Sequence, residues 1–260
     1  MSDIRLEGKI ILVTGATQGV GEAIARAAAA SGAAGLAITG RNATRGERVA
    51  REISAQGCPT LFVAAELGEP AECRRIVAEA AERFTHIDGL VNAAGLTDRG
   101  TIDDTSVELW DRLFAVNVRA PFILTQEVVR RLKATKRPGS IVNIITFSSH
   151  GGQPFLTAYA ASKGALGVLT KNNAHALRFD RIRVNGINIG WTDTPGEHAT
   201  QKRDGKPADW LARAEAAQPF GRLLKPQDAA TLAVYLLSDA AGPMTGAVID
   251  FDQNVMGAYD

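Results

Sequence analysis

The sequence predicts an α/β fold, a single doubly wound parallel sheet of about seven strands flanked by helices. Three observations predict it: short apolar runs recur along the chain, stretches rich in alanine or charged residues separate them, and a glycine-rich turn follows the first apolar run. Apolar runs of this kind are typical of parallel strands buried on both faces. Their alternation with helices requires right-handed crossovers, which put helices on both sides of the sheet.

The strands are expected at the apolar runs, of which the first reads Ile-Ile-Leu-Val. They are residues 10–13, 36–39, 61–64, 89–92, 140–145, 183–189 and 247–251. The stretches between them favour helices because alanine and most charged residues have high helix propensity. The predicted helices are residues 21–31, 45–56, 70–83, 107–133 and 157–179. Ligands of such sheets bind beyond the carboxyl ends of the strands, so a functional site is expected there.

Length and composition suit one large domain, residues 1–260, with 45% hydrophobic and 22% charged residues. A net charge of +1 provides no electrostatic basis for binding nucleic acid or an anionic membrane. The start of the chain lacks the apolar core of a signal peptide, and no apolar run is long enough to span a bilayer. Cys58 and Cys73 stand in no metal-binding spacing. We therefore expect reduced thiols, no metal and a cytoplasmic protein.

The glycine-rich turn reads Thr-Gly-Ala-Thr-Gln-Gly-Val-Gly over residues 14–21 and joins the first strand to the first helix. Glycines let the backbone approach a pyrophosphate closely, and the helix N-terminus offers free N–H groups and a partial positive charge. Strand, glycine-rich turn and helix in this order predict a nucleotide-binding turn rather than an ordinary connection. Its expected contacts are Gly15, Thr17, Gln18, Gly19 and Val20.

Tyr159 and Lys163 stand four residues apart in the predicted helix 157–179, so both side chains project from one face. A free phenol, with a pKa of about 10, is a poor base near neutral pH. A neighbouring ammonium is expected to lower that pKa, so that the Tyr can exchange a proton with a substrate hydroxyl or carbonyl. A chance pair on a helix surface is the alternative, and the nucleotide-binding turn argues against it.

The glycines at 15, 19 and 21, with the Tyr-x-x-x-Lys motif downstream, resemble the short-chain dehydrogenase/reductase family. The resemblance runs essentially end to end. It includes the Asn-Ala-Ala-Gly segment after the fourth strand, Asn117 in its helix, and the fifth and sixth strands. It implies one Rossmann-type domain that binds a nicotinamide dinucleotide. From that segment it adds the cofactor contacts Asn92, Ala93, Ala94 and Gly95.

By the same resemblance, the catalytic set comprises Asn117, a hydroxyl residue, Tyr159 and Lys163. Lys163 would also hold the nicotinamide ribose, and Asn117 would hold a water in a proton relay. Thr146 occupies the position, thirteen residues before the tyrosine, where the family has serine. Ser148, two residues on, would face the same way if the strand continued that far, and remains the alternative hydroxyl.

Cofactor choice is read at the end of the second strand, where an acidic residue commonly binds the adenosine ribose. Gly40 and Arg41 stand there instead. A missing carboxylate and a guanidinium both favour a 2′-phosphate, so we predict NADP as preferred over NAD. Glu66 takes the place of an Asp near the adenine. The remaining predicted cofactor contacts are Leu67, Gly190, Thr192 and Thr194.

Substrate contacts are expected from His150, Gln153 and Trp191, with Asp193, Glu197 and His198 nearby. Such groups suit a small polar molecule, for instance a sugar or polyol. The predicted reaction is hydride transfer between the nicotinamide and a secondary alcohol or ketone. A 3-oxoacyl-carrier-protein-type ketoreductase and a catalytically silent nucleotide-sensing protein are the alternatives. The resemblance also implies a homodimer or homotetramer.

Overall fold

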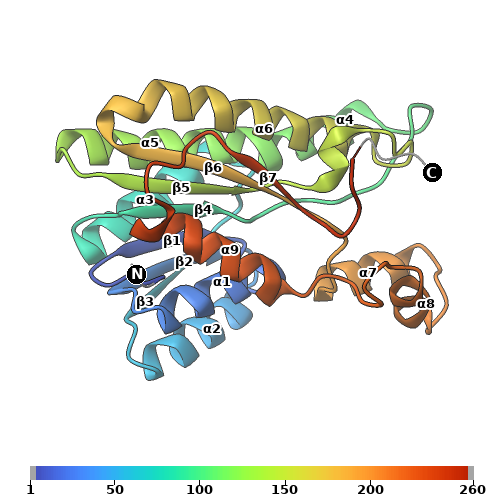
Figure 1. The fold of residues 1–260 in the computed structure, drawn as a ribbon, viewed down its shortest axis with the longest axis horizontal. Helices are drawn as coiled ribbons and strands as arrows, with labels where there is room; N and C mark the ends of the chain where they lie inside the picture. The colour runs from blue at the N-terminus through green and yellow to red at the C-terminus, as the bar shows by residue number, and fades with distance from the viewer. Residues whose placement is uncertain (1–3, 257–260) are drawn as a thin grey trace.

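The computed structural model describes residues 4–256 and contains one sheet of seven parallel strands, in the order β3-β2-β1-β4-β5-β6-β7 (Figure 1). The strands are β1 (Ile10–Thr14), β2 (Gly35–Gly40), β3 (Thr60–Ala64), β4 (Gly89–Asn92), β5 (Gly139–Ile144), β6 (Ile182–Ile189) and β7 (Val248–Phe251). The chain winds outward from β1 to β3, then returns to β4 beside β1 and winds the other way. The predicted doubly wound fold is confirmed.

Alternation along β1 supplies both faces of the core. Ile11 and Val13 pack into a cluster with α1 (Gly19–Ala30), α2 (Ala43–Ala55) and α9 (Pro226–Leu237). Leu12 packs into a second cluster with α3 (Pro70–Phe84), α5 (Ala120–Ala134) and α6 (Thr157–Leu177). All three side chains are inaccessible to solvent. A strand buried on both faces has no polar side, which explains the continuous apolar run in the sequence.

The helices flank this sheet on both faces. They are α1 (Gly19–Ala30), α2 (Ala43–Ala55), α3 (Pro70–Phe84), α4 (Val107–Phe114), α5 (Ala120–Ala134), α6 (Thr157–Leu177), α7 (Pro195–Arg203), α8 (Trp210–Ala216) and α9 (Pro226–Leu237). The helical segment predicted at 107–133 runs without a break from Val107 to Ala134, and a π-helical turn, Ala115–Arg119, lies within it between α4 and α5. Extra turns of this kind often occur at functional sites, and Asn117 stands inside this one.

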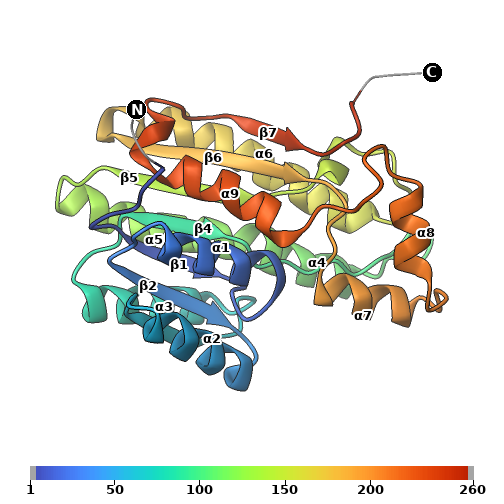
Figure 2. The same cartoon turned by 60° about the horizontal axis from the view of Figure 1, so that its bottom comes forward.

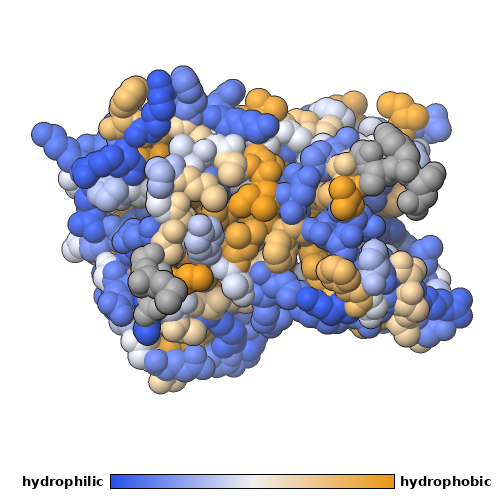
Figure 3. Space-filling view, in the orientation of Figure 1, coloured by the Kyte–Doolittle hydropathy of each residue, from blue (hydrophilic) through white to orange (hydrophobic). Residues whose placement is uncertain are grey.

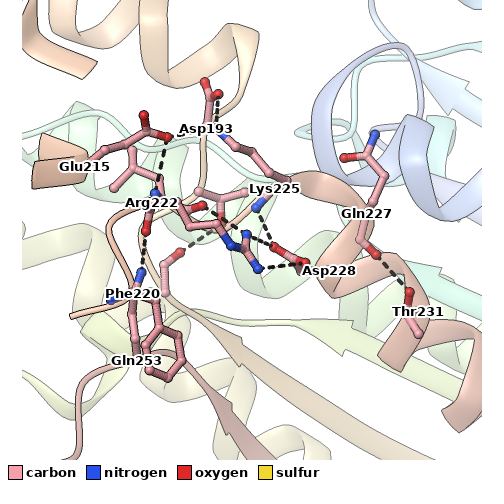
Figure 4. A network of polar contacts seen from close by, with 12 residues as sticks. Asp193, Glu215, Phe220, Arg222, Lys225, Gln227, Asp228, Thr231 and Gln253 are labelled. Atoms are coloured by element: carbon pink, nitrogen blue, oxygen red, sulfur yellow. Dashed lines mark hydrogen bonds and ion pairs between the residues drawn. The ribbon is translucent and has the colours of Figure 1, made fainter. Parts of the chain in front are cut away.

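Helices α7 and α8 form a lobe at the carboxyl edge of the sheet, set apart from the flanking helices (Figures 1 and 2). Ionic contacts hold its base (Figure 4). The Lys225 ammonium lies 2.9 Å from both Asp193 Oδ2 and Glu215 Oε1. The Arg222 guanidinium pairs with Asp228 at the start of α9. These contacts connect the segment after β6 to the body of the protein.

The sequence predictions also concern membrane-spanning helices, metal-binding clusters and disulfides in the described residues. None of their helices is long and apolar enough to cross a membrane. Residues 4–256 also contain no cluster of three or more His, Cys, Asp or Glu side chains suited to a metal ion. Cys58 and Cys73 are both buried free thiols, and burial raises the pKa of Cys73 to about 11.

Candidate active site

The glycine-rich turn is closely packed against the loop that follows β4. Gly15 has φ +66°, and a Cβ there would lie 2.7 Å from the Ala94 Cα. A Cβ on Gly21 would lie 2.4 Å from the Gly15 carbonyl oxygen. The Thr14 hydroxyl accepts hydrogen bonds from the Ala93 and Ala94 amides, both at 3.1 Å. The turn is thereby fixed in a shape that only small residues permit.

A cleft of about 1130 Å³ opens at the carboxyl edge of the sheet, beside the N-terminus of α1. Most of the predicted cofactor contacts line it. They are Gly15, Thr17, Gln18, Gly19, Val20, Arg41, Glu66, Leu67, Ala93, Ala94, Gly95, Tyr159, Lys163, Gly190, Thr192 and Thr194. Its length along the edge, the glycine cradle and the helix N-terminus together fit a dinucleotide.

One end of the cleft carries two arginines. Arg41 lies directly after β2, and its guanidinium is 3.9 Å from the Glu66 carboxylate across the rim. Both side chains are more than half exposed. Arg45, one helical turn further on, also lines the cleft and was not predicted. Arg45 stands in the first turn of α2, whose N-cap Asn42 follows Arg41, and this nearness in sequence to the end of β2 would have been a usable signal.

Tyr159 and Lys163 face the middle of the cleft from α6. The Lys163 side chain is buried, and its ammonium donates to the Ile144 carbonyl oxygen at 2.8 Å. Burial lowers the pKa of Lys163 to about 8 and raises the pKa of Tyr159 to about 12. The expected lowering of the phenol pKa by the ammonium is therefore not seen in the protein alone, because desolvation disfavours the charged form of both groups.

Thr146 and Ser148 both line the cleft but differ in their relation to Tyr159. The Thr146 side chain favours the phenolate and so partly opposes the rise of the Tyr159 pKa. Its hydroxyl also accepts from the Ser148 amide at 3.3 Å. Strand β5 ends at Ile144, and Ser148 lies in a 3-10 helix, Phe147–His150. The condition under which Ser148 would face the same way as Thr146 is thus not met.

Asn117 lies behind the cleft rather than on its wall, and its side chain is inaccessible to solvent. Its amide oxygen accepts from the Leu96 amide at 2.9 Å. Its amide nitrogen donates to the Leu96 carbonyl and to the Ser162 hydroxyl, each at 3.0 Å. The side chain therefore fixes the loop after Gly95 to helix α6, next to Lys163.

Two further predicted site residues, besides Asn117, lie outside the cleft lining. Asn92 is buried and donates to Asn143 Oδ1 at 2.8 Å, inside the sheet. His150 lies 2.8 Å from Asp250 Oδ1, and Asn188 donates to the same oxygen at 2.7 Å. These contacts hold the imidazole toward β7 and away from a bound substrate.

The other end of the cleft is polar and mixed in charge. The predicted Gln153 and Trp191 line it, together with Arg99, Glu197 and Lys206. Arg99 and Lys206 were not singled out from the sequence. They come from the loop after β4 and from the turn between α7 and α8, and only the fold brings these segments together.

Known proteins match the chain over nearly its whole length. The protein-family model described as Enoyl-(Acyl carrier protein) reductase matches residues 15–253. NADP-dependent (R)-specific alcohol dehydrogenase of Lentilactobacillus kefiri is 34% identical over 246 residues, covering 94% of each chain. Sorbitol dehydrogenase of Cereibacter sphaeroides is 34% identical over 257 residues, covering 96% of this chain and 98% of its own.

A solved structure agrees with these matches. The crystal structure of 3-oxoacyl (acyl-carrier-protein) reductase from Agrobacterium tumefaciens C58 with NADP bound has a TM-score of 0.88 and 26% identity, covering 97% of this chain and 96% of that one. Together with the glycine-rich turn and the Tyr-x-x-x-Lys motif in one cleft, these matches show that the chain belongs to the short-chain dehydrogenase/reductase family of oxidoreductases.

Proposed function

We propose that the chain, working as one catalytic domain over residues 1–260, transfers a hydride between NADP(H) and a secondary alcohol or ketone of a small polar molecule. The observation that carries this proposal is the cleft itself. Tyr159, Lys163 and the Thr146 hydroxyl meet on its wall, beside a glycine cradle and a helix N-terminus that fit a dinucleotide.

The cofactor, when bound, supplies the hydride acceptor for oxidation or the donor for reduction. Tyr159 takes the proton from the alcohol oxygen, or gives one to the carbonyl oxygen. The Thr146 hydroxyl, already a partner of the phenol, orients the same oxygen. Lys163 would hold the nicotinamide ribose, and its positive charge favours the phenolate form of Tyr159 in the transition state. Asn117 positions the loop and helix that carry this set.

Removing the Thr146 hydroxyl should have a larger effect than removing that of Ser148. Thr146→Val keeps the shape of the side chain but cannot orient the substrate oxygen, so we expect kcat to fall about 100-fold, the scale of one lost hydrogen-bond donor in an active site. Ser148→Ala is the matched control and should retain kcat within a few-fold. Steady-state kinetics of both variants decides the assignment, and the reverse order would transfer the role to Ser148.

Preference for NADP rests on the two arginines at the adenosine end. Gly40 offers no carboxylate to repel a 2′-phosphate, and Arg41 and Arg45 both line the cleft there. Guanidinium groups bind phosphate through paired, charge-assisted hydrogen bonds. The solved relative with NADP bound and the NADP-dependent alcohol dehydrogenase agree with this choice.

Arg41→Ala is expected to lower kcat/KM with NADP+ by about tenfold and to leave kcat/KM with NAD+ nearly unchanged, because only the former presents a 2′-phosphate. Arg51→Ala is a suitable control, since Arg51 is exposed on α2, the helix that follows Arg41, and lies outside the cleft. Parallel kinetics with both cofactors gives the answer. A wild-type enzyme that prefers NAD+ by about tenfold would contradict the proposal.

A sugar or polyol is the proposed substrate class. Although Leu96, Phe155 and Leu156 also line the cleft, it offers amides, an indole and charges of both signs that suit the hydroxyl groups of a polyol. Similarity to a sorbitol dehydrogenase supports this choice, and similarity to a 3-oxoacyl reductase keeps the ketoreductase as the alternative. Reduction of NADP+ by free polyols, measured by the absorbance of the reduced nicotinamide, would favour the polyol dehydrogenase over the carrier-protein-type ketoreductase. It would also exclude a catalytically silent nucleotide sensor.

Association of two or four copies is proposed through the edge of the sheet. Figure 3 shows apolar atoms gathered near the middle of the face where β7 and α9 lie in Figure 1. Partly buried apolar side chains of these two elements include Leu232 of α9 and Ile249 and Phe251 of β7. β7 is an edge strand, and an uncovered edge favours pairing with another chain. Sedimentation equilibrium measures the oligomeric state.

The two buried free thiols suit the reducing cytoplasm, which we propose as the location of the protein.

A further inference from the structure

Glu197 places a carboxylate on the substrate side of the cleft. It stands in the first turn of α7, where its backbone amide donates to the Thr194 hydroxyl at 3.0 Å. Its side chain lines the cleft and is only 17% exposed. An ionised carboxylate that is largely buried needs hydrogen-bond donors. The contacts of its two oxygens therefore show which of them still lacks a donor.

All protein contacts of the carboxylate use one oxygen. Oε1 accepts from the Trp191 indole at 2.9 Å and from the Gln201 amide at 2.5 Å, and Arg99 Nη2 lies 3.7 Å away. Within residues 4–256, Oε2 has no hydrogen-bond partner, yet it is not among the buried polar atoms without a partner. Oε2 is therefore accessible, and it belongs to a side chain whose orientation three neighbours already fix.

The surrounding charges indicate which donor suits Oε2. Arg99 is shared between Glu197 and Asp204, whose Oδ2 lies 2.6 Å from Arg99 Nη1, and Lys206 lines the cleft close by in sequence. Arg203 lies 3.7 Å from Asp204 and 3.4 Å from Asp98, so three cations stand against three carboxylates in this region. A substrate carboxylate would be repelled by Glu197, whereas an ammonium gains little from a region without net charge. A neutral hydroxyl satisfies the oxygen without adding charge.

We propose that Glu197 Oε2 accepts a hydrogen bond from a second substrate hydroxyl, next to the one that is oxidised, so that the enzyme selects diols and polyols over simple secondary alcohols. This inference rests on the proposed function. It is supported by the electrostatic effect of Glu197 on Tyr159, since the carboxylate helps to raise the pKa of the phenol. Glu197 and Tyr159 also line the same cleft, so both face the space that a substrate would occupy.

The test compares matched substrates that differ by one hydroxyl: 2,3-butanediol with 2-butanol, and cis-1,2-cyclohexanediol with cyclohexanol. We expect the wild-type enzyme to favour each diol in kcat/KM. Glu197→Gln keeps the size of the side chain and an oxygen for Trp191 and Gln201, so it should fold and bind NADP+ normally. It should lower kcat/KM for the diols by about tenfold, mainly through KM, and leave the mono-alcohols within a few-fold.

Asp209→Asn is the control, because Asp209 is an exposed carboxylate of the same lobe that pairs with Arg213 at 2.8 Å outside the cleft. Asp209→Asn should leave kcat/KM unchanged for both the diols and the mono-alcohols. Equal losses for diols and mono-alcohols in Glu197→Gln, or a wild-type enzyme without diol preference, would overturn the role of Glu197 while leaving the proposed function intact. Turnover of none of the four alcohols and of no free sugar or polyol, with NADP+ still bound, would overturn the proposed function and this role with it.

Discussion

Replacing Tyr159 by phenylalanine is expected to lower kcat by about 1000-fold while leaving cofactor affinity nearly unchanged, because proton transfer by one positioned side chain contributes on this scale. The substitution removes only the phenol oxygen. The ring, which lies against the cleft wall on α6, stays in place. Lys163 keeps its hydrogen bond to the Ile144 carbonyl, so the helix should not move.

Tyr235→Phe provides the control, since it makes the same chemical change in α9, outside the cleft. Its kcat should equal that of the wild-type enzyme. Single-turnover and steady-state rates of both variants, with NADP+ and the best alcohol, measure the effect. Retention of more than about a tenth of kcat in Tyr159→Phe would show that another group moves the proton.

Gly15→Ala is the second change with a large expected effect. An added Cβ would lie 2.7 Å from the Ala94 Cα and 2.8 Å from the Ala94 backbone nitrogen, and neither backbone atom can move cheaply. The residue also has φ +66°, which costs about 1–2 kcal/mol for any side chain. We expect the cofactor cradle to open, with a loss of NADP+ affinity of at least about tenfold and a lower Tm.

Gly8→Ala is the control that distinguishes backbone strain from a steric clash of the added Cβ. Gly8 has φ +73°, but an added Cβ there would meet nothing within 4 Å. It should lose about 1–2 kcal/mol from the backbone alone, a fall in Tm of about 2–8 °C, and keep full affinity for NADP+. Calorimetric titration and thermal unfolding of the two variants give both quantities. Equal affinities for NADP+ in both variants would mean that the turn does not contact the cofactor.

The fold could be predicted because its strands are buried on both faces. Leu12 and Val13 point to opposite sides, and each meets a separate core, so no polar residue interrupts the run. The lobe of α7 and α8 could not be predicted in this way, because both helices are short and bury few residues, and α7 carries mostly polar residues. The π-helical turn at Asn117 has no local signal either, since Val-Asn-Val continues the pattern of an ordinary helix.

The directions of side chains are the part of the site that the sequence could not predict. The glycine-rich turn and Tyr159 with Lys163 follow from local spacing alone, and the structure brings them into one cleft. His150 was expected to face the substrate, but its orientation depends on Asp250, a hundred residues later. The pKa of Tyr159 is raised, whereas the sequence predicted that Lys163 would lower it. The reason is similar, since this pKa depends on how deeply the fold buries the phenol.

Hydride transfer is the central claim, and isotope labelling tests it most directly. The wild-type enzyme would be given NADP+ and a secondary alcohol or polyol carrying deuterium on the carbinol carbon, and the reduced nicotinamide would be analysed by NMR. Direct transfer within the cleft predicts that the deuterium appears on one face of C4 and that Tyr159→Phe abolishes its appearance. Reduced nicotinamide without the label, or no reduction with any alcohol despite tight NADP+ binding, would contradict the proposed function.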